Sequence, residues 1–144
     1  QPDKMGAGLA YHAARLYTTY ITAARKHGIQ IFPAVLPGYD DRKMRGSARP
    51  AVPREDGATY LKAWELIRWF LRCQETGPQP IVMLNSFNEW HEGTQIEPSL
   101  EFNDTFVHWT RDIKAGIEGG LASDAPCPVP ETLARFECHP DDAL

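Results

Sequence analysis

The sequence lacks the features that mark two large classes of protein. It has no apolar run near the roughly 18 residues that a membrane-spanning helix needs. Its 15 Lys and Arg residues are outnumbered by 19 Asp and Glu residues, and the net charge of −4 leaves no basic surface for a nucleic acid. We therefore expect neither a membrane span nor a nucleic-acid partner.

The amino terminus also lacks a targeting signal. Its first five residues, Gln-Pro-Asp-Lys-Met, have neither the basic nor the apolar region of a signal peptide. The first residue is not Met, however, and an upstream part could still carry such a signal. The sequence therefore leaves the compartment open.

Cysteine is scarce, and its spacing fits no metal site. The three cysteines are Cys73, Cys127 and Cys138. We expect Cys73 to pack within a helix. Cys127 and Cys138 flank a proline-rich segment, where they are either free thiols or partners in a disulfide formed in an oxidising compartment. The sequence indicates no metal and no organic cofactor.

The composition is that of an ordinary globular segment, with 42% hydrophobic and 24% charged residues. Apolar residues recur at helical spacing in three stretches, and two short apolar runs between them are typical of strands. The predicted elements are a helix from residue 9 that stops at 26–28, a strand over 29–35, a helix over 56–74, a strand over 81–87 and a helix over 104–117. This alternation predicts an α/β fold with parallel strands.

Proline, aspartate and glycine set the limits of these elements. Pro33 cannot donate to a strand ladder, so the first strand is either short or diverges at that point. Asp56 is the expected cap of the middle helix, and the glycines at 119–120 end the last one. Trp69 is expected to pack outside the core or to be partly exposed. The middle helix has an apolar stripe made of Tyr60, Leu61, Trp64, Ile67, Phe70 and Leu71.

A polar cluster follows the second predicted strand. Residues 85–98 are Asn-Ser-Phe-Asn-Glu-Trp-His-Glu-Gly-Thr-Gln-Ile-Glu-Pro, which places Glu89 and Glu92 three positions apart. On a helical turn their Cβ atoms would lie roughly 5 to 6 Å apart, nearer the carboxyl spacing of retaining glycosidases than that of inverting ones. Such a pair can cleave a glycosidic bond, with one carboxyl as the acid. The alternative is a turn whose acidic side chains only stabilise a following helix.

The neighbouring side chains in this cluster suit a sugar site. Trp90 can stack on a sugar face, and Asn88 and Gln95 can form hydrogen bonds with a sugar or with the glutamates. His91 lacks a second imidazole at ligand spacing, so we expect it to pack or to orient a carboxylate rather than bind a metal. Glu97 is a candidate support or sugar contact.

A second polar loop, residues 36–55, follows the first predicted strand. The carboxyl ends of parallel strands lie on the same face of a sheet, and ligands gather there. We therefore expect this loop and residues 88–102 to emerge together and to form one cleft.

Three residues of the loop over 36–55 are candidates for this cleft. Tyr39 and Asp40 are candidate sugar contacts, the ring by stacking and the carboxylate by accepting hydroxyl protons. Arg45 could orient a glutamate or hold its charge. The alternative for Asp40 and Arg45 is a solvated turn. That alternative is the interpretation we favour for Arg42, Lys43 and Arg49.

The segment 87–98, from Phe87 to Pro98, resembles the signature of endo-α-mannosidase-type glycoside hydrolases of family 99 and of the related WbsX proteins of bacterial polysaccharide gene clusters. The loop Pro37-Gly-Tyr-Asp-Asp41, followed by Arg45, resembles a loop of the same group. The resemblance extends from about residue 9 to about residue 116. It implies a (β/α)8 TIM barrel of roughly 250 residues or more, of which a 144-residue chain would be the C-terminal portion.

The composition predicts a division of the chain, and the resemblance implies roles for the glutamates. We expect a partial barrel over 1–120 and a loosely attached tail, rich in Pro and Asp, over 121–144. By position, Glu89 would deprotonate the substrate's own 2-hydroxyl, which attacks the anomeric carbon and forms a 1,2-anhydro sugar. Glu92 would act as general acid and then as base. The substrate would be an oligosaccharide or polysaccharide with α-linked mannose or a related sugar, cleaved with retention.

Two other functions stay open at this point. A WbsX-type protein would use the same cleft for glycosyl transfer to a sugar acceptor in polysaccharide biosynthesis. A barrel fragment that cannot complete its cleft would be a non-catalytic carbohydrate-binding or structural protein. Its unpaired strand edges would favour association with itself or with a partner chain.

Overall fold

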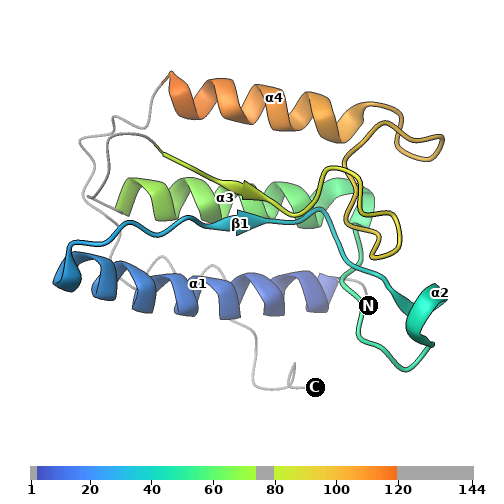
Figure 1. The fold of residues 1–144 in the computed structure, drawn as a ribbon, viewed down its shortest axis with the longest axis horizontal. Coiled ribbons are helices and arrows are strands. Elements are labelled where there is room, and N and C mark those ends of the chain that lie inside the picture. The colour runs from blue at the N-terminus through green and yellow to red at the C-terminus, as the bar shows by residue number, and fades with distance from the viewer. Residues whose placement is uncertain (1–2, 74–79, 120–144) are drawn as a thin grey trace.

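The computed structural model describes residues 3–73 and 80–119 (Figure 1). Its elements are α1 (Asp3–His27), β1 (Ala34–Val35), α2 (Arg42–Arg45), the 3-10 turn η1 (Glu55–Gly57), α3 (Ala58–Cys73), β2 (Met83–Leu84) and α4 (Thr105–Glu118). The predicted alternation of helices and strands is confirmed, and the fold is a mixed α/β structure. The predicted tail over 121–144, with its two cysteines, lies outside the described residues.

The two strands pair in parallel, with Ala34 opposite Met83 and Val35 opposite Leu84. The predicted strands over 29–35 and 81–87 are too long, because each paired segment contains only two residues. Pro33 has no N–H, so it contributes only its carbonyl oxygen, which accepts a hydrogen bond from Met83 at 2.8 Å. From Ser86 on, the second segment forms hydrogen bonds within its own loop rather than with β1.

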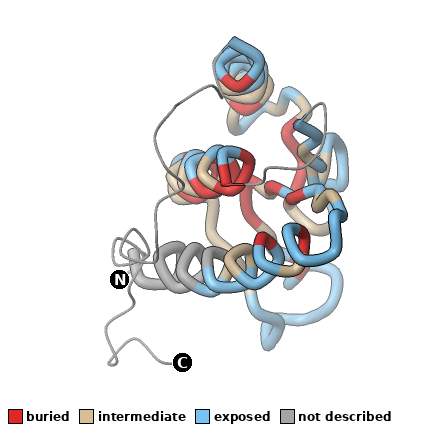
Figure 2. Tube along the Cα trace, turned by 90° about the vertical axis from the view of Figure 1, so that its left-hand side faces the viewer, coloured by how far each residue is buried: buried red, intermediate tan, exposed pale blue. Residues whose placement is uncertain are grey.

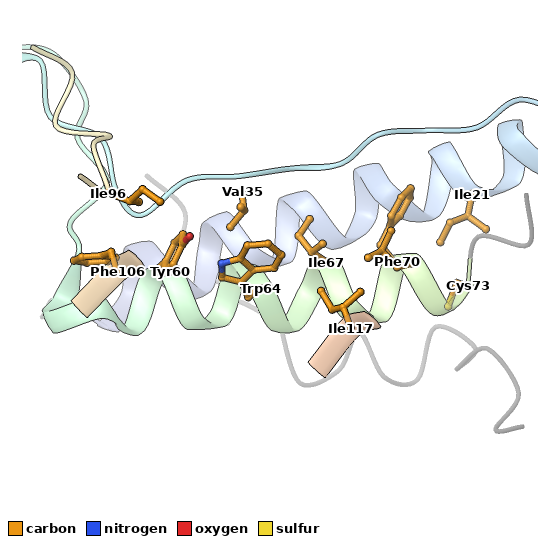
Figure 3. Close-up of a cluster of buried hydrophobic side chains, with 11 residues drawn as sticks. Ile21, Val35, Tyr60, Trp64, Ile67, Phe70, Cys73, Ile96, Phe106 and Ile117 are labelled. Carbon is orange, nitrogen blue, oxygen red and sulfur yellow. The ribbon is translucent and has the colours of Figure 1, made fainter. Parts of the chain in front are cut away.

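Helix α3 is central to the core, because it packs against both α1 and β1. Figure 3 shows its buried side chains gathered with Val35 of β1 and Ile21 of α1. The predicted stripe is wrong at Leu61, which is 42% exposed. Trp69 is half-buried, as expected. The stripe is confirmed at its other members, which are buried: Tyr60, Trp64, Ile67, Phe70 and Leu71.

The two ends of α3 differ from the prediction. Asp56 does not cap the helix, because it lies inside η1 with a φ of 51°, and α3 begins at Ala58. The Thr59 hydroxyl donates to the carbonyl oxygen of Pro53 at 2.6 Å and ties the start of the helix to the preceding loop. At the other end Cys73 is buried in the core, as expected of a packing residue, and it is also disulfide-bonded, which the sequence did not indicate.

Helix α4 begins and ends within one residue of the predicted range. Phe106 and Ile117 are its buried residues. The ring centroids of Tyr60 and Phe106 lie 5.4 Å apart, and the Tyr60 and Thr110 hydroxyls lie 2.7 Å apart. Figure 2 shows the buried residues concentrated toward the interior, between the helices and the loops. Helix α4 therefore joins the same core through the first half of α3.

The sheet has one covered face and one bare face. Pro33 and Val35 are buried, whereas Phe32 is 48% exposed. On the other segment Ile81 is 46% exposed and Met83 is 55% exposed. Successive strand residues point to opposite faces. Within the described part of the chain, nothing covers the face that carries the exposed apolar residues.

None of the helices over 3–73 and 80–119 has the length and hydropathy of a transmembrane span.

Candidate active site

The residues after β2 form one turn that closes on itself. The Ser86 hydroxyl accepts the N–H of Glu89 at 2.9 Å, as a helix cap does. The N–H of Gly93 donates to Trp90 and that of Thr94 donates to Glu89, each at 3.2 Å, while Gly93 has a φ of 62°. This pair of bonds around a left-handed glycine is the Schellman ending of a helix. The two glutamates thus lie on a short, capped helical turn at the carboxyl end of β2.

Replacing Gly93 with Ala is expected to destabilise the protein by about 1 kcal/mol, because a side chain is strained in the left-handed region. A Cβ atom would lie 3.4 Å from the Asp40 nitrogen, an ordinary contact, so strain dominates. The urea midpoint measures the change. Gly116→Ala on α4 is the control, since nothing lies within 4 Å of its new Cβ and alanine favours a helix. Equal effects of the two changes would contradict the assignment.

The two polar loops meet, as the parallel pairing predicts. The N–H of Asp40 donates to the carbonyl oxygen of Glu92 at 2.7 Å. The Arg54 guanidinium donates through Nη2 to the carbonyl oxygens of Gly93 at 2.9 Å and Gln95 at 2.6 Å. Figure 1 shows both loops at the same end of the strands. The prediction that residues 36–55 and 88–102 converge is confirmed.

The environments of Glu89 and Glu92 differ. Glu89 is exposed, and its Oε1 accepts the backbone N–H of His91 at 3.1 Å. The Glu92 side chain is 30% exposed, and its Oε1 lies 3.7 Å from Nη2 of Arg45. Among the described residues, the Glu89 carboxylate is therefore held only by a backbone N–H, whereas the Glu92 carboxylate lies near the Arg45 guanidinium.

Asp41 anchors that cation, although its sequence context does not single it out. Its side chain is 1% exposed and accepts the Tyr39 hydroxyl at 2.8 Å. Arg49 lies 3.2 Å and Arg45 3.5 Å from the same Oδ2 atom. Burial alone would raise the pKa of Asp41, but the hydrogen bonds from Tyr39 and Arg49 bring it below its usual value. Arg49 is exposed, as expected of a solvated loop residue, but it also binds this buried carboxylate.

The Asp40 carboxylate pairs with a different arginine, Arg42. Both of its oxygens are bound by Arg42, at 2.8 Å from Nε and 2.7 Å from Nη2. These hydrogen bonds lower the pKa of Asp40 to about 2. A depressed pKa means that the pair stabilises the fold fully above the ordinary aspartate value, and that this contribution is lost as the pH falls through about 2. Both side chains remain half-exposed.

Trp90 is held by Glu97. The indole Nε1 donates to Oε2 of Glu97 at 2.8 Å, while the Trp90 side chain remains 49% exposed. The carbonyl oxygen of Asn88 accepts the N–H of Trp90 at 3.1 Å. The ring therefore has a fixed orientation and an open surface, which is what a sugar platform requires.

A cleft of about 790 Å³ opens between the two loops, and we call it the loop cleft. The glutamates do not line it, and neither do Arg45, Asn88 and Glu97. The predicted site residues that do line it are Tyr39, Asp40, Trp90, His91 and Gln95. In the described ranges, no three His, Cys, Asp or Glu side chains gather closely enough to hold a metal ion. The two loops were expected to form one cleft that contains the glutamates, but Glu89 and Glu92 lie outside the loop cleft.

Arg54 is a further lining residue that the sequence pattern does not reveal. Its guanidinium carbon lies 4.8 Å from the Phe102 ring centroid and 4.7 Å from that of Phe106. Burial lowers the pKa of Arg54 from its usual value. Together with its bonds to the turn carbonyls, this stacking fixes the turn to the core at α4. Its role depends on aromatic residues about fifty positions away, which no local pattern shows.

Comparison with known proteins identifies relatives. The model of glycosyl hydrolase family 99 matches residues 6–111. The human "Glycoprotein endo-alpha-1,2-mannosidase-like protein" is 36% identical over 75 residues, which are 51% of this chain and 15% of that protein. The "Bifunctional protein HldE" of Cronobacter sakazakii (strain ATCC BAA-894) is 30% identical over 66 residues, which are 46% of this chain and 14% of that protein.

A solved structure has the same fold. It is that of the GH99 endo-alpha-mannosidase from Bacteroides thetaiotaomicron, which matches with a TM-score of 0.62 at 23% identity and covers 78% of this chain and 35% of that chain. The matched part of this chain thus spans well under half the length of each of these relatives. The family match covers more than half of the 144 residues. The chain belongs to glycosyl hydrolase family 99.

Proposed function

We propose that this chain is the C-terminal portion of a retaining glycosidase of the endo-α-mannosidase type, with Glu89 and Glu92 as its carboxyl pair. The observation that carries the proposal is the capped turn after β2, which displays two carboxylates three residues apart where the preceding loop meets it. In barrel enzymes the active site lies at the carboxyl ends of the strands. A solvated turn would not need the buried Asp41 cluster beside it.

The proposed fold is a (β/α)8 barrel, with residues 1–120 as its part in this chain. Each strand is followed by a long helix, β1 by α3 after the short α2 and η1 and β2 by α4, and the strands are parallel neighbours. Two successive βα units of this kind are the repeating element of such a barrel. The bare apolar face of the sheet would then face the barrel interior, where side chains from the other strands would cover it.

In the proposed reaction Glu89 takes the proton of the substrate's 2-hydroxyl, and the resulting oxygen attacks the anomeric carbon. The bond to the leaving oxygen breaks as Glu92 gives that oxygen a proton. Glu92, now ionised, then takes a proton from water, which opens the 1,2-anhydro sugar at the anomeric carbon, and the 2-oxygen recovers its proton from Glu89. Two inversions give net retention. Arg45 would balance the charge that Glu92 acquires.

The proposal is tested with a panel of α-mannosides and the polypeptide encoded by the complete gene. Release of sugar by the parent protein, with retained anomeric configuration by NMR, is the expected result. The same reactions with an added sugar acceptor separate hydrolysis from transfer, because a transferase would give a product only when the acceptor is present. No release under either condition would contradict both catalytic functions and favour a carbohydrate-binding role.

The 144-residue chain on its own is expected to self-associate through the bare sheet face. Met83 is 55% exposed on this face, beside other exposed apolar residues, and an exposed apolar patch favours association. Met83→Glu should shift the chain toward monomer in sizing with light scattering. The control is Leu100→Glu, which adds the same charge at a fully exposed residue off the sheet. A monodisperse parent monomer would contradict this expectation.

A further inference from the structure

We propose that Asp41 is a positioning residue of the reaction, because it shares the Arg45 guanidinium with Glu92 and so leaves Glu92 able to hold its proton. The inference rests on the proposed function, in which Glu92 gives that proton to the leaving oxygen. Asp41 is 1% exposed beneath its loop, and its effect on the reaction passes through the arginine.

The backbone fixes Arg45 beside both carboxylates. The N–H of Arg45 donates to the carbonyl oxygen of Asp41 at 2.9 Å, and side chains four residues apart on such a helical turn are neighbours. The N–H of Asp40 donates to the carbonyl oxygen of Glu92 at 2.7 Å and ties the start of this turn to the turn of the glutamates. Figure 1 shows α2 at the end of the strands where the glutamate turn also lies. The backbone thus places Arg45 next to Glu92 without using the arginine side chain.

The Arg45 side chain joins the two carboxylates. Its Nη1 lies 3.5 Å from Oδ2 of Asp41, and its Nη2 lies 3.7 Å from Oε1 of Glu92. Both distances are those of ion pairs and are longer than a hydrogen bond. The guanidinium is therefore held by charge, and the attraction that Glu92 receives from it depends on the charge of Asp41.

The burial of Asp41 does not depend on Arg45. A buried carboxylate is costly unless it is paired and hydrogen-bonded, and Oδ2 already accepts the Tyr39 hydroxyl at 2.8 Å and Nε of Arg49 at 3.2 Å. Burial opposes the ionisation of Asp41, but these hydrogen bonds bring its pKa below the usual value, so it is charged at neutral pH. The second arginine adds little to this arrangement, whereas it gives Glu92 a cation.

The charges around Glu92 balance when it is ionised. Arg45 and Arg49 supply two positive charges and Asp41 one negative charge, so an ionised Glu92 makes the group neutral. Without Asp41 the two arginines would hold Glu92 in its ionised form, which has no proton to give. The other charged or titratable groups of residues 40–45 and 86–95 form no ion pair with Glu92 in the described structure; they are Asp40, Arg42, Lys43, Glu89 and His91.

The test is the pH dependence of kcat/KM for alkyl α-mannosides, measured with the complete gene product and its Asp41→Asn variant. The rate falls at high pH as the acid loses its proton. In Asp41→Asn this fall should move to lower pH by about 0.5 to 1 unit, because Glu92 loses its proton more readily beside two uncompensated arginines. Aryl mannosides with acidic phenols do not need that proton and should show no such shift. A variant that only loosened the loop would lower the rate or the melting temperature without moving the fall.

Two further variants complete the test. Arg45→Gln should move the fall to higher pH, because Glu92 loses its cation, and the Arg45 side chain is 58% exposed, so this replacement should fold. Opposite shifts on removal of opposite charges are not expected of a merely structural cluster. Asp112→Asn is the matched control, since Asp112 forms an exposed pair with Arg111 at 2.9 Å on α4 and should leave the profile as it is in the parent.

An unmoved fall in Asp41→Asn, or a shift to higher pH, would overturn the proposal. If that variant does not fold, an unmoved fall in Arg45→Gln, or a shift to lower pH, would do the same. Hydrolysis by the parent protein is measured beside them. An active parent with an unmoved profile in the variants would remove the role of Asp41 and leave the proposed function standing, whereas an inactive parent would remove both.

Discussion

Hydrolysis of every α-mannoside is expected to fall by about 10²- to 10⁴-fold when Glu89 is replaced by Gln, the range that one general base contributes. An amide cannot take the proton of the substrate's 2-hydroxyl, and without that step the internal nucleophile does not form. The fall should not depend on the leaving group, because deprotonation is needed whichever group departs. The substitution preserves shape, and the amide oxygen can still accept the N–H of His91 that the carboxylate accepts at 3.1 Å.

The measurement is kcat for aryl and alkyl α-mannosides with the complete gene product. Glu118→Gln is the matched control, since Glu118 lies on α4 and forms an exposed pair with Lys114 at 3.0 Å. Such surface pairs contribute little, so this variant should react and melt as the parent does. A Glu89→Gln protein with parental rates would remove Glu89 from the proposed role.

Replacing Glu92 with Gln should give a loss that depends on the leaving group. The variant lacks the proposed acid, so alkyl mannosides, whose leaving oxygens need a proton, should lose about 10²- to 10⁴-fold in rate. In aryl mannosides whose phenols are acidic, the phenolate can leave without that proton, so the rate of the first step should fall much less. The slope of log kcat/KM against the pKa of the leaving phenol should therefore become steeper than in the parent.

The neighbouring cations supply the control for Glu92. Arg42→Gln removes a charge from the loop that carries Arg45, but Arg42 pairs with Asp40 rather than with either glutamate. It should leave the leaving-group slope as it is in the parent. A parental slope in Glu92→Gln would contradict the acid role, and full activity in both glutamate variants would end the catalytic assignment of this turn.

Helices α3 and α4 were predictable because their signal is local, whereas α1 begins at Asp3, before the predicted start, and the short α2 was not predicted. Apolar residues at helical spacing place α3 and α4 within two residues of their observed limits, since each helix needs only its own sequence to form its hydrogen bonds. Strand length was not predictable in the same way. The strand predicted over 81–87 extends past its apolar run, which ends at Leu84. Asn85 still donates its N–H to Val35, but from Ser86 on the backbone bonds within the turn, so the paired segment ends at Leu84.

The candidate site likewise has features that the sequence predicts and features that it does not. The run from Ser86 to Gln95 contains the cap and the glycine that its turn needs, so the turn could be expected from adjacent residues. The ion-pair partners of Arg42, Arg45 and Arg49 could not be predicted from adjacent residues. Three arginines in one loop look alike in sequence, but one pairs with exposed Asp40 and two with buried Asp41. Which carboxylate is buried depends on how the loop packs against the turn.

By itself, the sequence determined the family, the order of helices and strands, and the place of Glu89 and Glu92 after the second strand, because a contiguous signature and local periodicity carry that information. Only the tertiary structure decided that strand pairing is confined to two residues on each side, that Asp41 holds Arg45 beside Glu92, and that Gln95 and Arg54 line a cleft apart from the glutamates. The physical reason is that burial and pairing join residues distant in the chain, and their free energies depend on what surrounds each group.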